Sequence, residues 1–165
     1  MTSSSSFSSA STLQYCPRWK YNVFLSFRGE DTRKTFTGHL YEGLKNRGIF
    51  TFQDDKRLEQ GDSIPEELLK AIEESQVALI FFSKNYATSR WCLNELVNIM
   101  EFKEEENGQT VIPIFYNVDP SHVRYQSESF VEAFAKHESR YKDDVEGMQK
   151  VQGWRTALTA AANLK

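Results

Sequence analysis

The amino-acid sequence predicts an α/β fold in which a parallel sheet carries helices on both of its faces. Short apolar runs alternate along the chain with amphipathic segments of helical period, an order that is typical of repeated βα units. The apolar runs do not alternate strictly between polar and apolar residues, so both faces of each strand are expected to be covered. The four strands expected from these runs span residues 21–27, 49–53, 77–83 and 111–118.

Helical segments separate these strands and follow the last of them. Phe36, Leu40 and Leu44 recur at spacings of four residues before Gly48, which favours a helix that ends at the glycine. Ser63 is a candidate N-cap, and a proline two residues later suits a first helical turn. The expected helices span residues 35–47, 64–75, 91–105, 128–141 and 148–164, and residues 119–126 are expected to form a loop.

One residue limits where the fourth strand can lie in the sheet. Pro113 has no amide N–H to donate to a neighbouring strand, so it fits poorly in a central strand. We therefore expect Pro113 to lie near the start of its strand, or in a strand at the edge of the sheet.

Length and composition indicate one folded domain with a tail. The chain has 165 residues, of which 39% are hydrophobic and 26% are charged, as in an ordinary globular domain. Residues 1–19 are rich in serine and contain no acidic residue, so a disordered tail is expected there, with a chloroplast transit peptide as the alternative interpretation. Residues 20–165 then form the domain.

Charge, cysteine content and hydropathy narrow the class of function. A formal net charge of -3 gives no basic surface of the kind that nucleic-acid binding usually requires. The two cysteines, Cys16 and Cys92, provide no disulfide framework, which favours a reducing compartment such as the cytosol or the nucleus. The longest apolar run, residues 77–82, is far shorter than the roughly 18 to 20 residues of a membrane-spanning helix. We expect neither nucleic acid nor membrane as a partner.

The loop after the first strand is a candidate ligand site, because ligands of open α/β sheets bind beyond the carboxyl ends of the strands. It contains Arg28, Gly29, Glu30, Asp31 and Thr32. An arginine guanidinium matches phosphate oxygens two at a time, so this loop can hold a nucleotide. The alternative is a salt-bridged turn without a ligand.

The loop after the second strand suggests a different chemistry. Asp54 and Asp55 end this strand, and Gly61 in the following polar stretch can take a positive φ. Paired acids at a strand end can bind Mg²⁺ or accept a phosphoryl group, as in receiver domains. However, Ser83 and Lys84 stand at the end of the third strand, where a receiver-like site needs an acidic residue. This difference argues against the phosphoacceptor hypothesis.

Glu95 lies in the first turn of the helix expected over residues 91–105. Helical spacing places it about 200° from Leu93, away from the apolar stripe, which favours a solvated side chain. Its place near the strand-end crevice, with Trp91 one turn earlier on the same side, favours a functional role instead. No metal site is expected, because the three histidines have no suitable mutual spacing: His39, His122 and His137.

Four blocks of the sequence carry a specific pattern. They read YNVFLSFRGEDTRKTFTGHL, GIFTFQDDKRLEQG, IPEELLKAIEESQVALIFFSKNYATSRWCLNEL and VIPIFYNVDPSHVRYQ. In this order they resemble the Toll/interleukin receptor (TIR) domains of plant intracellular immune receptors, especially those of solanaceous virus-resistance proteins. The resemblance covers residues 20–165. It implies a flavodoxin-like fold and an activity that cleaves NAD⁺ as substrate, without a cofactor, and depends on self-association.

The resemblance also implies roles for individual residues. The glutamate of the W-C-L-x-E-L motif is Glu95, which would be catalytic. Asp55 and Gly61 belong to a loop that moves in such domains when subunits stack. His39 matches the histidine of a Ser-His pair in a self-association face, whereas Gly38 stands at the serine position. The substrate-binding positions implied by the family are Phe27, Arg28, Gly29, Glu30, Asp31, Thr32, Asp55, Gly61, Ser89 and Trp91.

The partners and the extent of the domain follow from the same resemblance. Family members continue past the AANL segment into a fifth strand and a final helix, which we expect to be missing here because the sequence ends at Lys165. The implied partners are further copies of the chain and full-length TIR-type immune receptors. The implied products are nicotinamide and ADP-ribose-type nucleotides that trigger plant defence. The alternative is a non-catalytic adaptor that acts by TIR–TIR contacts alone.

Overall fold

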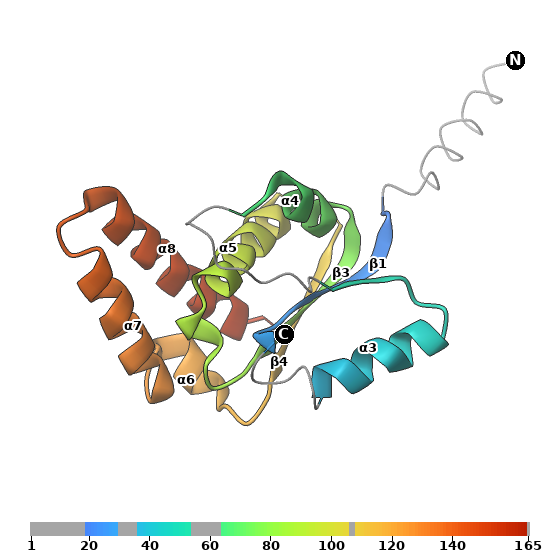
Figure 1. Cartoon of the computed structure of the whole chain (residues 1–165), viewed down its shortest axis with the longest axis horizontal. Coiled ribbons are helices and arrows are strands. Elements are labelled where there is room, and N and C mark those ends of the chain that lie inside the picture. The colour runs from blue at the N-terminus through green and yellow to red at the C-terminus, as the bar shows by residue number, and fades with distance from the viewer. Residues whose placement is uncertain (1–18, 30–35, 54–63, 106–107, 165) are drawn as a thin grey trace, which may run out of the picture.

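The computed structural model describes residues 19–29, 36–53, 64–105 and 108–164 (Figure 1). The first half of the domain alternates strands and helices, and its last third is helical. In chain order the elements are β1 (Tyr21–Ser26), α3 (Phe36–Asn46), β2 (Thr51–Gln53), α4 (Glu66–Glu73), β3 (Ser75–Phe82), the 3₁₀ helix η1 (Tyr86–Thr88), α5 (Arg90–Glu104), β4 (Thr110–Phe115), α6 (Pro120–Tyr125), α7 (Ser129–Arg140) and α8 (Val145–Ala162).

The four strands form one parallel sheet in the order β2-β1-β3-β4. Each strand therefore sends its carboxyl end to the same side of the sheet, and β1 and β3 are central. The predicted α/β class with four parallel strands is confirmed. The observed strands differ from the expected ones by two or three residues at some ends, the largest difference being that β4 ends at Phe115.

Pro113 lies in an edge strand of the described sheet, one of the two positions that its missing N–H predicts. Within the described residues β4 pairs with β3 alone. The amide of Tyr116 donates to the carbonyl of Phe82 at 2.9 Å, which fixes the side on which alternate residues of this strand face β3. Pro113, three residues earlier, faces the opposite side. Its missing donor therefore costs no hydrogen bond to β3.

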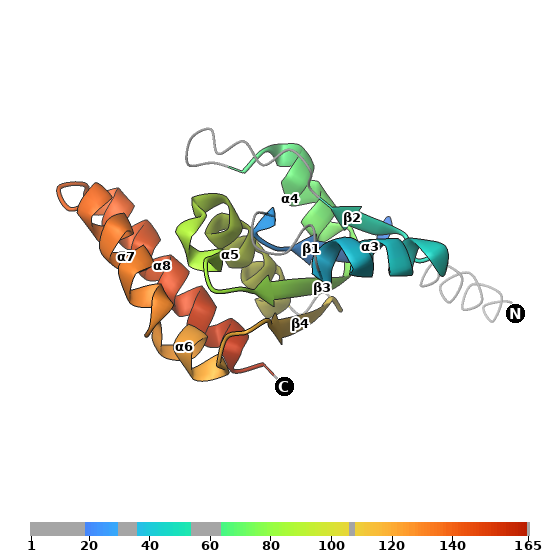
Figure 2. The same cartoon turned by 60° about the horizontal axis from the view of Figure 1, so that its bottom comes forward.

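Helices cover both faces of the sheet, as predicted from strands that are apolar on both sides. Figure 1 shows α3 on one side of the sheet and α4 and α5 on the other. Leu40 and Leu44 of α3 pack against a small buried cluster, while α4, α5 and the C-terminal helices share a much larger core. The small cluster contains Val23, Leu25, Phe27 and Phe81. Figure 2 shows α7 and α8 side by side, with α6 beneath them.

The expectation that residues 119–126 form a loop is wrong in part, because this segment contains helix α6. Asp119 is the N-cap and Pro120 takes the first helical position, a combination that starts helices well. Six residues are too few to show a helical period, so the apolar pattern did not reveal them. Likewise α8 starts at Val145, three residues earlier than expected, because Asp144 caps it through a 3.2 Å bond from the amide of Gly147.

The Asp119 cap gives a pH-dependent prediction. The Ser121 hydroxyl, at 2.7 Å, and its amide, at 2.8 Å, both donate to Asp119 Oδ1 and hold the pKa of that carboxyl below its usual value. Because the folded pKa is lowered, the stabilisation is complete above the unfolded pKa of about 3.9 and is lost as pH falls through the folded value. Ser121→Ala is expected to raise the pKa of Asp119 in an NMR titration. An unchanged pKa would contradict this account.

None of the helices in the described ranges is long and apolar enough to cross a membrane.

Candidate active site

The carboxyl group of Glu95 is fully buried where β1 ends against α5. Its side chain is 0% exposed, and Ser26 Oγ donates to Glu95 Oε1 at 2.9 Å. The solvated position indicated by helical spacing is therefore wrong. The helix starts at Arg90, which also places Glu95 in its second turn rather than its first.

Helix α5 is buried on every side at its amino-terminal end, which explains why spacing misplaced Glu95. All six residues from Trp91 to Leu96 are buried, in contrast to the single apolar stripe of a surface helix. The sheet and η1 contact this end of α5, and α8 contacts the helix as well. One contact with α8 is polar, since Trp154 Nε1 donates to Asn94 Oδ1 at 3.0 Å.

Two hydroxyl groups that sequence reasoning missed, those of Ser26 and Tyr86, form a chain of contacts that leads to Glu95. Ser26 Oγ lies 2.8 Å from Tyr86 Oη, and Tyr86 also donates to the carbonyl of Cys92 at 3.1 Å. Ser26 and Tyr86 are both fully buried. A hydroxyl carries one proton, so while Ser26 donates to Glu95 the Tyr86 proton goes either to Ser26 Oγ or to the Cys92 carbonyl, and not to both at once. The one available signal was a serine inside the apolar run of the first strand.

Ser89 and Trp91, two of the expected substrate-binding residues, lie at the start of the same helix. Ser89 is the N-cap of α5, and its side chain accepts from the amide of Cys92 at 3.1 Å. It is 7% exposed, while Trp91 is 9% exposed and packs in the main core. Trp91 precedes Glu95 by four residues, so both side chains lie on one side of the helix.

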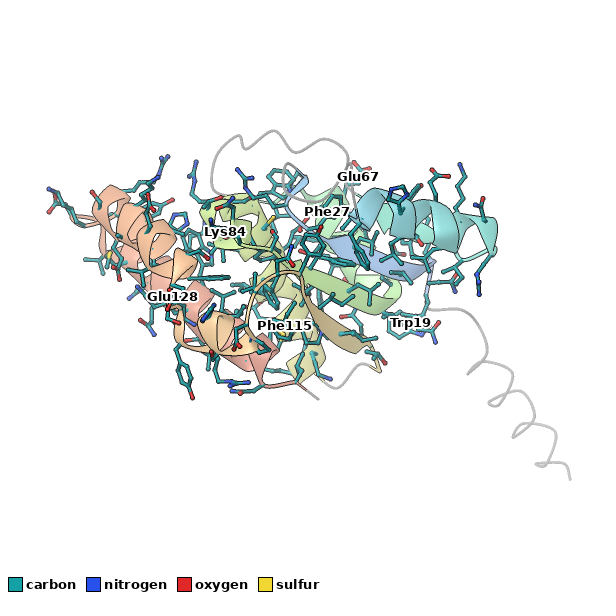
Figure 3. All side chains as sticks on the ribbon, turned by 90° about the horizontal axis from the view of Figure 1, so that it is seen from below. Trp19, Phe27, Glu67, Lys84, Phe115 and Glu128 are labelled. Atoms are coloured by element: carbon teal, nitrogen blue, oxygen red, sulfur yellow. The ribbon has the colours of Figure 1, made fainter. Side chains whose placement is uncertain are left out.

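The chain that leaves β1 lies beside the start of α5. Cys92 Sγ donates to the carbonyl of Phe27 at 3.4 Å, which connects these two segments directly. The ring of Phe27 is fully buried in the small cluster under α3, so its backbone faces α5 while its ring does not. Arg28 and Gly29 follow and are partly exposed. Figure 3 labels Phe27 and Lys84, which follow the carboxyl ends of β1 and β3.

The other candidate residues separate into two groups. Those of the two polar loops lie outside the described residues: Glu30, Asp31, Thr32, Asp54, Asp55 and Gly61. His39 and Gly38 lie on α3, against the other face of the sheet from α5, and His39 is exposed. They belong to a surface and not to the buried site. The part of the chain that the structure describes contains no group of three or more metal-ligating side chains.

The site thus consists of a buried carboxyl at the carboxyl ends of two parallel strands, with hydroxyl groups and an aromatic ring around it. The chain belongs to the TIR domain family, whose model matches residues 20–165.

Its relatives are plant disease-resistance proteins. The chain is 72% identical over 148 residues to TMV resistance protein N of Nicotiana glutinosa, a match that covers 90% of this chain and 13% of that protein. It is 59% identical over 167 residues to Disease resistance protein RPV1 of Vitis rotundifolia, covering 99% of this chain and 11% of that protein. The chain therefore spans a small fraction of the length of these relatives.

A solved structure agrees with the fold. The TIR domains in the structure of the activated Roq1 resistosome directly recognizing the pathogen effector XopQ match with a TM-score of 0.79 and 54% sequence identity. The match covers 88% of this chain and 86% of that chain. The expected TIR fold is confirmed.

Proposed function

We propose that this TIR domain cleaves the bond between nicotinamide and ribose in NAD⁺ and that Glu95 is the catalytic residue. The observation that carries the proposal is the position of the Glu95 carboxyl, at the carboxyl end of β1 and oriented by Ser26. Ligands of open α/β sheets bind in this crevice. Ser26 and Glu95 are 69 positions apart in the sequence, so the fold brings the pair together.

One carboxylate is sufficient for this reaction. The nicotinamide nitrogen is cationic in NAD⁺, so nicotinamide leaves with the bonding electrons as a neutral molecule and needs no general acid. The ribose that remains has oxocarbenium character, which a nearby carboxylate stabilises. Attack by water on the ribose carbon gives ADP-ribose and one proton. Attack by another oxygen of the same nucleotide gives a cyclic product.

The burial of Glu95 supports an activity that depends on assembly. A carboxyl that is 0% exposed cannot touch a dinucleotide until the site opens. Contacts with further copies of the chain provide the energy for such a change. The matching structure is that of TIR domains in an activated resistosome, which agrees with a homo-oligomeric active form. The products would then act as defence signals, in the cytosol or the nucleus, alone or together with full-length TIR-type receptors.

Product analysis by mass spectrometry tests the proposal. The parent and Glu95→Ala are incubated with NAD⁺ over a range of protein concentrations. Nicotinamide release by the parent is expected to rise more steeply than in proportion to concentration, because only the assembled form is active. Glu95→Ala is expected to release none. Equal rates for the two proteins would end the proposal.

The second candidate is a non-catalytic adaptor that acts through TIR–TIR contacts. The same full burial of Glu95 favours it, because the Ser26–Glu95 bond can simply connect β1 to α5. The absence of nicotinamide release from the parent at concentrations at which light scattering shows oligomers would support the adaptor.

A further inference from the structure

Helix α7 and its C-cap Tyr141 lie along residues 84–90, here called the connecting segment, which runs from the end of β3 to the first residue of α5. Three hydrogen bonds join the two. Ser129 Oγ donates to the carbonyl of Lys84 at 3.0 Å, and Arg90 Nη1 donates to Tyr141 Oη at 3.3 Å. Between them, His137 Nε2 lies 2.7 Å from the carbonyl of Ala87. Figure 3 labels Lys84 and Glu128, which lie near the first of these contacts. The segment is therefore held at its start, middle and end.

The contact of His137 is the shortest and the most deeply buried of the three. The side chain is 6% exposed, and its ring packs edge-on against Trp154, with centroids 4.9 Å apart, and against Phe134 at 5.8 Å. A carbonyl oxygen only accepts hydrogen bonds, so Nε2 carries the proton and donates to Ala87. Water cannot replace this donor easily, because the bond lies inside the core.

The connecting segment carries two residues that support Glu95 indirectly. Tyr86 contacts Ser26, which in turn donates to Glu95. Ser89 caps the helix on which Glu95 lies. A shift of the Ala87 peptide would therefore move both Tyr86, whose hydroxyl contacts Ser26, and Ser89, which caps the helix of Glu95. Misplacement of a catalytic group by about 1 Å can cost on the order of 100-fold in rate.

We propose that His137 is a positioning residue for the reaction of Glu95, acting through the carbonyl of Ala87; this rests on the function proposed above. The imidazole contributes an N–H donor and touches no substrate. Two substitutions separate the hydrogen bond that His137 donates from the packing of its ring. Phe keeps an aromatic ring in contact with Trp154 but has no donor. Gln places an amide N–H at a reach similar to that of Nε2.

Steady-state kinetics on the parent, His137→Phe, His137→Gln and Glu138→Ala tests this assignment. The kcat of His137→Phe is expected to fall by at least about tenfold, with KM changed by less than about threefold, because the substitution misplaces the carboxyl without touching the loop after β1, where the family resemblance predicts dinucleotide binding. His137→Gln is expected to recover kcat to within about threefold of the parent. Glu138→Ala is the matched control, since Glu138 is the next residue of α7 and bonds to Arg155 at 3.1 Å, not to the connecting segment.

Amide hydrogen exchange gives a readout that needs no activity. Amides of the connecting segment are expected to exchange at least about tenfold faster in His137→Phe than in the parent or in Glu138→Ala. Unchanged kcat and unchanged exchange in His137→Phe would overturn the proposal, and so would failure of Gln to restore either. If the parent releases no nicotinamide, the proposed function fails, while the exchange rates still decide whether His137 holds the segment.

Discussion

A chain that carries Glu95→Gln is expected to keep its fold and to release nicotinamide at least about 100-fold more slowly than the parent. The amide has nearly the shape of the carboxylate, and its oxygen still accepts the bond from Ser26, which is 2.9 Å long in the parent. What it lacks is the negative charge that would stabilise the oxocarbenium-like ribose. Mass spectrometry of the products measures the loss, under conditions in which parent and variant form the same oligomers.

Stability separates this loss of activity from a loss of fold. Gln has nearly the size of Glu and keeps the acceptor for Ser26, so the melting temperature of Glu95→Gln is expected to stay close to that of the parent. Glu101→Gln is the control, because Glu101 lies on the same helix and is exposed. It is expected to leave both the rate and the melting temperature unchanged. A Glu95→Gln protein that is folded and retains more than about a tenth of the parent rate would remove Glu95 from catalysis.

The fold could be predicted from the sequence because its signals are local. An apolar run that is too short for a buried helix, followed by an amphipathic segment, identifies a βα unit within about 20 residues. Pro113 indicated a position near a strand start or in an edge strand by the same kind of local argument, which depends on one missing N–H. Helix α6 was missed because its local signal is a helix cap and not an apolar period. Its cap and proline mark a helix start, and six residues add no period to support them.

The candidate site could be predicted only in part, because its contacts are not local. A helical spacing argument assumes one buried side, and α5 is buried all round where Glu95 lies. Ser26 and Tyr86 are 60 residues apart, and His137 and Ala87 are 50 residues apart. No sequence window contains these pairs. The family resemblance identified Glu95 without them, whereas its hydroxyl partners and the support from α7 required the structure.

Gly147 shows that packing contacts, too, cannot be predicted from a local stretch of sequence. A glycine in the first turns of a helix normally makes that helix less stable, because glycine is a poor helix former. Here an added Cβ would lie 2.3 Å from Cδ1 and 2.6 Å from Cγ of Tyr141. Tyr141 is buried, and its ring is also edge-on to Trp154 at 6.3 Å. The absence of a side chain at Gly147 is therefore what allows Tyr141 to pack against α8 while its hydroxyl accepts from Arg90.

Gly147→Ala is expected to lower the free energy of unfolding by about 1 to 3 kcal/mol, even though alanine is the better helix former by about 1 kcal/mol. The clash involves the ring and the Cβ of Tyr141, not the far end of a flexible chain, so backbone or rotamer must shift. Gly153→Ala on the same helix is the matched control. An added Cβ there meets no atom within 4 Å, so only the propensity gain remains, and the free energy of unfolding is expected to rise by up to about 1 kcal/mol. Urea denaturation of the two variants measures both changes in the free energy of unfolding. A Gly147→Ala protein as stable as Gly153→Ala would show that Tyr141 can leave its place without a loss of stability.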